Sequence, residues 1–168
     1  APLIFNKFAT SLIGAGAELK LPHHVDDHVD YEAELCVVIG ATATRVKKRS
    51  AMKHVAGYTI MNDVSARQLQ AREKQWARAK GFDGSGPCGP CIVTADEVPD
   101  PHALDISTRV NGKVRQRSNT KQLVFDIPYL IEYISAAITL EPGDLISTGT
   151  PGGVGVYSNP PQFLQHGD

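Results

Sequence analysis

The apolar run at residues 35–39, which ends at Gly40, constrains the fold most strongly, and two glutamates, Glu32 and Glu34, precede it. A short apolar run rich in β-branched residues that ends at glycine predicts a buried β-strand. Successive side chains of a strand point to opposite faces, so Glu32 and Glu34 would project from the same face. Two carboxylates side by side near a core repel each other and are costly to desolvate. Either this strand end is exposed to solvent or a positive group lies between the glutamates.

Short apolar segments bounded by turn residues predict further strands at residues 3–8, 57–63, 90–95, 105–116 and 144–151. Asn111 and Gly112 lie between two alternating arms of the fourth segment, and Asn-Gly is the strongest short-range signal of a β-hairpin. The strands do not alternate regularly with helices, so a regular βαβ fold is not expected. The sequence predicts a mainly β, mostly antiparallel domain with minor α content.

Two helices are predicted between these strands. The first covers residues 64–79, with Asp63 as a candidate N-terminal cap. The second begins near Asp126 and has Pro128 in its first turn, a position that suits proline. An apolar stripe predicts that one face of this second helix packs on the core. The proline and glycine within residues 140–144 would end it.

The composition narrows the domain organisation and the class of partner. A chain of 168 residues is long enough for one domain with a real core, so residues 1–168 are expected to form a single domain. A formal net charge of −1 gives no basic surface for nucleic acid. No apolar run approaches the roughly 18–20 residues of a membrane span, so no membrane partner is expected. Three cysteines, an odd number, do not form a secreted disulfide framework, which favours a reducing cytoplasm.

The first predicted helix adds charged residues to the two glutamates. Asp63, Arg67 and Gln70 fall at i, i+4 and i+7, which places them on one helical face. This face can bind an anion beside a metal, or it can be a solvated face with an ion pair worth only about 0.3–0.5 kcal/mol. With Glu32 and Glu34, the carboxylates number three, without a convincing His or Cys partner. Such a set suits a hard cation, Mg²⁺ or Mn²⁺, which would also relieve the repulsion between the glutamates.

Two further segments are candidates for binding anions. Lys80 precedes a stretch rich in Gly and Pro that is expected to form an ordered loop. A lysine there can stabilise an oxyanion, although a surface lysine is the simpler interpretation. Residues 147–155 form a Gly-rich turn after a strand, and its backbone N–H groups and the Thr150 hydroxyl can hold a carboxylate. The turn is not a phosphate-binding P-loop, because no Gly-Lys-Ser/Thr follows.

Two other motifs contain residue types that are found in redox sites or metal sites, but their sequence contexts favour neither kind of site. Cys88 and Cys91 have the C-x-x-C spacing of thioredoxin-like redox sites. A helix should open at such a motif, whereas residues 92–101 predict a strand followed by a turn. Residues 23–28, "HHVDDH", have the composition of a metal site but follow Pro22 in a polar connection, which predicts a solvated loop.

Together, the motifs "VDYEAELCVVIG", "GYTIMNDVSARQLQ", "KGFDGSGPCGPCIV", "LEPGDLISTGTPGGVG" and "PPQFLQHGD" closely resemble the fumarylacetoacetate hydrolase family. They occur in order from about residue 7 to the last residue, so the resemblance covers nearly the whole chain. It implies the distinctive mixed β-sheet roll of this family's C-terminal domain, a homodimer, and enzymes that cleave or rearrange 2-oxo acids. It also implies one Mg²⁺ or Mn²⁺ per subunit, with Glu32, Glu34 and Asp63 as ligands.

The same resemblance implies roles for residues beside the metal. Lys80 would be the catalytic positive group near a developing oxyanion. Arg67 and Gln70 would orient the substrate or the metal ligands. Thr150 and the adjoining glycines, Gly149 among them, would receive the carboxylate of the substrate.

One part of the family pattern is missing from this sequence. Family members typically carry a His–Glu pair that activates water, on a lid upstream of the strand matching residues 2–8. The three histidines at the motif "HHVDDH" follow that strand and do not match the pair. Either the lid lies outside the given sequence or the protein lacks the hydrolytic base. The final "QFLQHGD" predicts a turn leading into another strand, so the domain is expected to be incomplete at both ends.

A 2-oxo acid can chelate a divalent ion through its carboxylate and keto oxygens, and the ion then stabilises an enolate. The leading hypothesis is a metal-dependent hydrolase that cleaves a C–C bond in acylpyruvate-like 2-oxo acids. The alternatives are an isomerase or decarboxylase of 2-oxo or 2-hydroxy-dienedioic acids in aromatic catabolism, a catalytically silent oxo-acid-binding homologue, and a redox protein. Three residues depart from the family pattern and are candidates for altered substrate choice: Gln68, Ser85 and Cys88.

Overall fold

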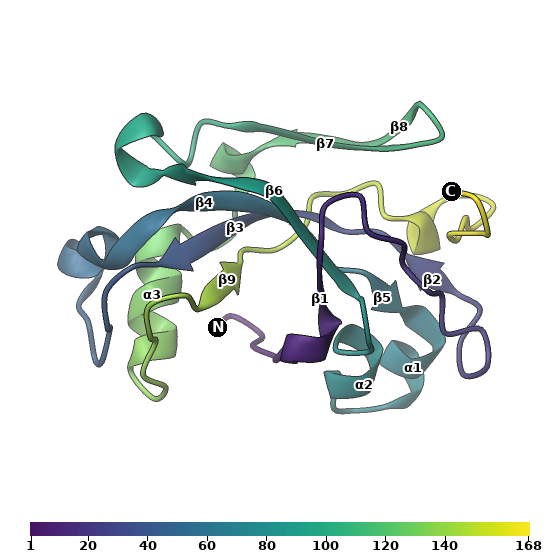
Figure 1. The fold of residues 1–168 in the computed structure, drawn as a ribbon, viewed down its shortest axis with the longest axis horizontal. Coiled ribbons are helices and arrows are strands. Elements are labelled where there is room, and N and C mark those ends of the chain that lie inside the picture. The colour runs from purple at the N-terminus through teal and green to yellow at the C-terminus, as the bar shows by residue number, and fades with distance from the viewer.

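The computed structural model describes residues 1–168, and a curled five-stranded sheet with the strand order β1-β6-β4-β3-β9 forms its centre (Figure 1). Its strands are β1 (Leu12–Gly14), β3 (Ala33–Ile39), β4 (Val55–Asn62), β6 (Gly86–Thr94) and β9 (Leu145–Ser147). Strands β1 and β6 are parallel, whereas every other neighbouring pair is antiparallel. The sheet is therefore mixed and mostly antiparallel, which confirms the predicted fold class.

Smaller elements flank this sheet. Strands β2 (Val29–Asp30) and β5 (Ser65–Ala66) pair with each other, as do β7 (Asp105–Val110) and β8 (Lys113–Asn119). The α-helices are α1 (Arg67–Arg72), α2 (Ala77–Lys80) and α3 (Ile127–Ser135). The 3₁₀ turns are η1 (Ala9–Ser11), η2 (Lys48–His54), η3 (Ala95–Glu97), η4 (Thr120–Gln122) and η5 (Gly155–Tyr157). None of the helices has the length and apolarity needed to cross a membrane.

The predicted hairpin is formed by β7 and β8. Asn111 and Gly112 join the two strands with φ angles of 50° and 76°. A two-residue turn with both φ angles positive matches the right-handed twist of the strands it connects, and Asn and Gly are the residues that tolerate it. The prediction of this turn from two residues alone is confirmed.

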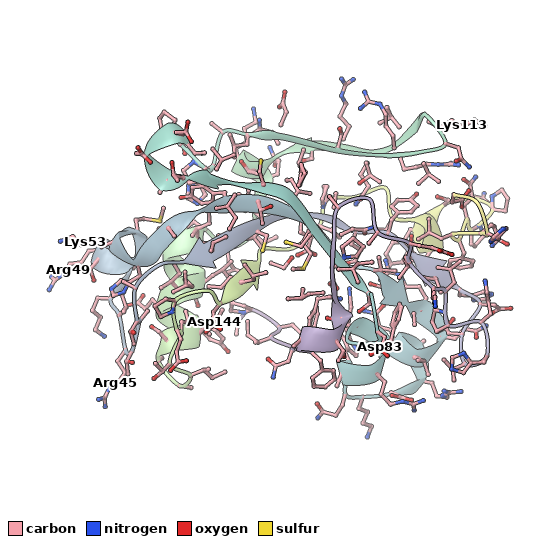
Figure 2. All side chains as sticks on the ribbon, in the orientation of Figure 1. Arg45, Arg49, Lys53, Asp83, Lys113 and Asp144 are labelled. Carbon is pink, nitrogen blue, oxygen red and sulfur yellow. The ribbon has the colours of Figure 1, made fainter.

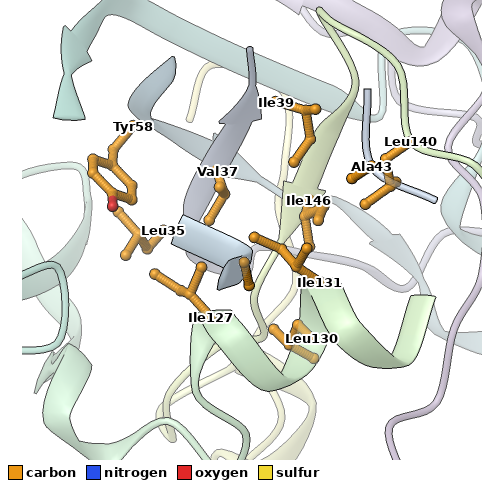
Figure 3. Packing of buried hydrophobic residues seen from close by; sticks show 11 residues of the cluster. Leu35, Val37, Ile39, Ala43, Tyr58, Ile127, Leu130, Ile131, Leu140 and Ile146 are labelled. Atoms are coloured by element: carbon orange, nitrogen blue, oxygen red, sulfur yellow. The ribbon is translucent and has the colours of Figure 1, made fainter. Parts of the chain in front are cut away.

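The main core lies between the sheet and α3 (Figure 3). Alternate side chains of β3 pack against α3, which presents Ile127, Leu130 and Ile131. Full burial of each such side chain contributes about 1.5–3 kcal/mol. The helix begins as predicted, because the Asp126 side chain accepts a hydrogen bond from the backbone N–H of Tyr129 at 2.8 Å. It ends earlier than predicted, at Ser135, because the chain turns back to pair Leu140 with Ala43.

The prediction of one helix over residues 64–79 is wrong. Pairing of Ser65 and Ala66 with β2 draws the first residues into an extended conformation, and the remaining residues form two short helices. Asp63 therefore lies outside α1, so it neither caps the helix nor shares a helical face with Arg67. The buried carboxylate of Asp26 instead accepts a hydrogen bond, at 2.8 Å, from the backbone N–H of Leu69 in the first turn of α1. The loop at residues 23–28 is thus not fully solvated.

The predicted strand at residues 3–8 is also wrong. Residues 1–8 have no regular secondary structure, and the first strand of the sheet begins at Leu12. The segment is held instead by its side chains, and the ring of Phe5 lies 5.7 Å from that of Trp76. The apolar side chains here thus contact the residue before α2 and the cavity rather than forming a strand of the sheet.

Gly155 is the position where the fold depends most on the lack of a side chain. A Cβ atom there would lie 1.7 Å from the carbonyl oxygen of Gln162 and 2.9 Å from Asp30 Oδ1. We expect Gly155→Ala to lower the free energy of unfolding by roughly 3 kcal/mol or more, measured by urea denaturation, because a backbone carbonyl must move. Gly14→Ala is the matched control, since no atom lies within 4 Å of its Cβ position. Equal stability of the two variants would contradict this account.

Candidate metal and substrate site

Three carboxylates converge where β3 begins and β4 ends. Antiparallel pairing places Glu34 opposite Met61, which brings Glu32 beside Asp63. One oxygen from each of Glu32, Glu34 and Asp63 lies within 4.8 Å of the others, and all three residues are at most 7% exposed. The backbone N–H of Asp63 donates to the carbonyl of Glu32 at 2.8 Å, which fixes the two chain segments together. The alternative of an exposed strand end is therefore excluded.

Lys80 is buried between two of these carboxylates. Its Nζ donates to Glu32 Oε2 at 2.9 Å and to Asp63 Oδ2 at 2.8 Å. The Phe5 ring lies 5.2 Å from the same nitrogen. Lys80 is thus not a surface lysine; it is the positive charge that allows Glu32 and Asp63 to be buried together, because a buried carboxylate without a partner would be unstable.

Arg67 holds Glu32 from the other side. Its Nη1 lies 2.7 Å from Glu32 Oε1 and donates to Gln70 Oε1 at 2.9 Å. Its Nε donates to Asp30 Oδ2 at 3.0 Å. Burial acts to lower the pKa of Arg67, but the carboxylates of Glu32 and Asp30 outweigh burial and raise it. The guanidinium therefore stays charged and fixes the orientation of Glu32.

Asp30 is a residue of this network that the sequence analysis missed. Asp30 is fully buried, and its carboxylate accepts hydrogen bonds from the backbone N–H groups of Gly155 at 2.7 Å and Val156 at 2.9 Å. It thereby connects β2 and η5 to Arg67. Its only signal in the sequence is its place directly before the "YEAE" motif, and that place does not distinguish it from a solvated aspartate.

Lys7 is the second residue that the sequence analysis missed. Its Nζ donates to Asp63 Oδ1 at 2.7 Å, to Ser85 Oγ at 3.2 Å and to the carbonyl oxygen of Lys80. Burial lowers the pKa of Lys7, although the Asp63 carboxylate opposes this. The sequence carried no clear signal for Lys7, because its segment was predicted to be a strand and its contacts come from distant parts of the chain.

Glu34 has no cationic partner. Its Oε2 accepts hydrogen bonds from Ser147 Oγ at 2.5 Å and from the backbone N–H of Gly149 at 2.8 Å. Burial and then the nearby Asp63 raise the pKa of Glu34 to about 7, despite these two bonds. Three carboxylates without imidazole or thiolate ligands form the donor set that hard divalent cations prefer. The residues present therefore fit a divalent metal ion, whose charge would offset that of Glu34.

A cavity of about 950 Å³ opens beside Glu34 and Asp63. Lys7, Gly149 and Thr150 also line it, and apolar side chains from α3 and from residues 123–125 form much of its remaining wall. With a divalent ion at the carboxylates, this combination with one lysine and an apolar wall would suit a small anion that has a carbon chain.

The sequence-predicted substrate residues divide into two groups. Gly149 and Thr150 line the cavity, although the Thr150 hydroxyl already donates to the carbonyl of Ala33 at 3.0 Å. A buried glutamine that the sequence analysis missed, Gln116, donates to the same hydroxyl at 2.8 Å. Arg67 and Gln70 do not line the cavity. They orient Glu32, and a direct contact of either residue with a substrate stays a prediction.

The C-x-x-C motif lies within β6, so no helix opens at Cys88. This confirms the predicted strand. The thiols of Cys88 and Cys36 share a hydrogen bond, which lowers the pKa of Cys88 to about 7 and raises that of Cys36. Cys91 is exposed, and all three cysteines are free.

The curled mixed sheet places the buried triad beside a cavity, an arrangement that suits a divalent metal and a small molecule. The model of the fumarylacetoacetate (FAA) hydrolase C-terminal family matches residues 1–168. The chain therefore belongs to the fumarylacetoacetate hydrolase family, whose members are enzymes that generally bind a divalent metal.

Curated relatives include proteins named oxaloacetate tautomerase. One mitochondrial member, from Homo sapiens, is 51% identical over 169 residues, covering 99% of this chain and 54% of the relative. YisK of Bacillus subtilis is 46% identical, covering 99% of this chain and 56% of the relative. The chain thus spans about half the length of the curated relatives that it matches.

Solved structures share the fold. A fumarylacetoacetate hydrolase from Exiguobacterium antarcticum has a TM-score of 0.93 and 40% identity, over 97% of this chain and 58% of that one. A 5-carboxymethyl-2-hydroxymuconate delta-isomerase from Mycobacterium smegmatis has a TM-score of 0.88 and 48% identity, over 92% of this chain and 60% of that one. These neighbours confirm the predicted mixed β-sheet roll.

The raised pKa of Glu34 predicts a pH dependence of stability. In metal-free protein, folded Glu34 binds its proton more tightly than unfolded Glu34, so the free energy of unfolding should fall as the pH rises from about 4.5 to about 7. Glu34→Gln should remove this part of the pH dependence in urea denaturation with EDTA present. Glu18→Gln, at an exposed position, is the control that should keep it. An unchanged pH profile in Glu34→Gln would contradict the assignment.

Proposed function

We propose that residues 1–168 form the catalytic domain of a metal-dependent isomerase that interconverts the keto and enol forms of a small 2-oxo acid such as oxaloacetate. The buried triad of Glu32, Glu34 and Asp63 beside the cavity carries this proposal. The names of relatives 46% and 51% identical support tautomerisation over the hydrolysis favoured by the sequence analysis.

In this proposal Glu32, Glu34 and Asp63 hold one Mg²⁺ or Mn²⁺ per subunit. When bound, the ion supplies a Lewis acid and a template for the carboxylate and keto oxygens of a 2-oxo acid. Lys80 and Arg67 keep the carboxylates converged, because each cation pairs with Glu32 and Lys80 also pairs with Asp63. The protein thus prepares the ligand geometry before any ligand binds.

Lys80 is also the proposed catalytic cation. Its Nζ bonds Glu32 and Asp63, so its positive charge lies close behind the triad and can stabilise negative charge that develops on an enolate oxygen held there. Arg67 and Gln70 orient Glu32 in this scheme. Gly149 and Thr150, which line the cavity, receive the carboxylate of the substrate in this scheme, with the backbone N–H of Thr150 as the donor because that of Gly149 bonds Glu34. The apolar wall excludes water, which strengthens these interactions.

Hydrolysis of a C–C bond in an acylpyruvate-like acid is the second candidate. The cavity of about 950 Å³ leaves room for a chain longer than that of a four-carbon acid, and the Exiguobacterium antarcticum structure is named a fumarylacetoacetate hydrolase. Both candidates use the same enolate. They differ in how it forms: in tautomerisation a proton leaves, whereas in hydrolysis water first attacks the distal carbonyl and the C–C bond then breaks.

The remaining expectations concern the assembly of subunits and the cellular compartment. The family resemblance predicts a homodimer, and the odd number of cysteines favours a reducing cytoplasm. The proposed partner is a small-molecule 2-oxo acid, whose charge the cavity can match.

The full-length protein tests the proposal directly. Conversion of enol to keto oxaloacetate, followed by ultraviolet absorbance, should require Mg²⁺ or Mn²⁺ and stop with EDTA. Glu34→Ala should lower the rate by on the order of 10²–10³ with little change in stability, because one of several like charges is removed. Glu18→Ala is the control. Full activity in EDTA would reject the proposal, and turnover of an acylpyruvate without tautomerisation would select the hydrolase.

Lys80→Met separates catalysis from binding. If Lys80 stabilises charge that grows toward the transition state, its removal should lower kcat by about 10²–10³ and raise KM much less. Metal affinity, measured by Mn²⁺ titration, should stay within a few-fold, and thermal unfolding should check that the variant folds. A change confined to KM would mean that Lys80 only attracts the anionic substrate.

A further inference from the structure

Lys7 is the only cationic residue that lines the cavity. Lys80 and Arg67 lie behind the triad and do not line it. Lys7 and the two ligands Glu34 and Asp63 therefore face the same space, and Nζ of Lys7 lies 2.7 Å from Asp63 Oδ1. A ligand that approaches the triad from the cavity meets the Lys7 ammonium before it meets any other cation of the protein.

Packing and hydrogen bonds hold the Lys7 ammonium in place, but one of these hydrogen bonds can be replaced by a bond to a ligand. Its stem packs closely over Gly86, where a Cβ atom would lie 2.9 Å from Lys7 Cε. Among its bonds, the one to Ser85 Oγ is long, at 3.2 Å, and the Ser85 hydroxyl has another partner, the carbonyl of Lys80, at 2.8 Å. An N–H of Lys7 can thus turn from Ser85 to a ligand without leaving a buried group unpaired.

The rest of the cavity wall gives a second carboxylate no comparable partner. The acidic lining residues repel it, the apolar lining residues cannot hydrogen-bond it, and the other polar lining residues, such as Asn6, Asn119 and Gln122, carry no charge. A 2-oxo acid whose carboxylate and keto oxygens point at the triad extends its far end along this wall. Of the residues that line the cavity, only Lys7 offers a positive charge to this second carboxylate.

We propose that Lys7 is a substrate-binding residue that receives the distal carboxylate of a dicarboxylic 2-oxo acid, and that it thereby selects dicarboxylates over monocarboxylates. The inference rests on the proposed function for the end of the substrate that faces the triad. Lys7 and Lys80 then have different roles. Lys80 stabilises negative charge that develops during the reaction, whereas Lys7 binds the carboxylate charge that is present throughout.

Two stable ligands isolate the distal carboxylate in the full-length, Mg²⁺-loaded protein. Oxamate and N-oxalylglycine share the same chelating head, but only N-oxalylglycine carries a second carboxylate. In calorimetric titrations the wild type should bind N-oxalylglycine at least about tenfold more tightly, as expected for one charge pair. Lys7→Met should reduce this ratio to near one while leaving the oxamate affinity within about threefold. With oxaloacetate as substrate, Lys7→Met should raise KM more than it lowers kcat.

Lys113→Met, at the tip of the β7–β8 hairpin (Figure 2), is the matched control and should keep the wild-type ratio. Lys7→Gln is a second variant, for use if Lys7→Met unfolds at the assay temperature. An unchanged ratio in either folded variant of Lys7 overturns the inference, as does an equal loss of both affinities. A wild type that binds both ligands equally overturns this inference alone. A wild type that binds neither overturns the proposed function as well.

Discussion

Mutual repulsion among three buried carboxylates is the constraint on which the rest of this structure depends. Glu32, Glu34 and Asp63 place oxygens within 4.8 Å of one another, and burial removes the water that would screen them. The fold offsets this repulsion with Lys80 and Arg67 and with backbone N–H groups from the turn after β9. Glu34 remains without a cation, and burial followed by the nearby Asp63 raises its pKa to about 7. A domain that retains this arrangement is suited to a divalent ion.

The groups that offset the repulsion come from separate parts of the chain. Lys80 ends α2, Arg67 begins α1, Gly149 follows β9, and Lys7 lies on the N-terminal segment. Because residues from four segments bond these carboxylates, the network also ties the segments together. Asp30 extends the network to η5 through two backbone N–H groups. Stability and site geometry are therefore coupled, because the same ion pairs hold both the carboxylates and these segments.

Local sequence patterns correctly predicted the structural elements that depend on interactions between residues close in the sequence. The run at residues 35–39 forms β3, Asn111 and Gly112 form the hairpin turn, and Asp126 caps α3. The helix predicted over residues 64–79 failed because two residues pair with β2, and tertiary pairing outweighs helix propensity. The strand predicted at residues 3–8 failed because its side chains pack on α2 and line the cavity. In both cases the deciding contacts come from residues distant in the sequence.

The sequence by itself determined which reactive groups this protein has: two glutamates before a buried strand, an aspartate after another strand, and motifs that resemble those of one enzyme family. It could not assign Lys7, Asp30 or Gln116, because a lysine, an aspartate or a glutamine has the same local signature whether it is solvated or buried. Only the tertiary structure decided which cations face the triad from behind and which one faces the cavity. The physical reason is that burial and pairing of charge depend on distances between strands and loops, and the order of residues along the chain does not contain those distances.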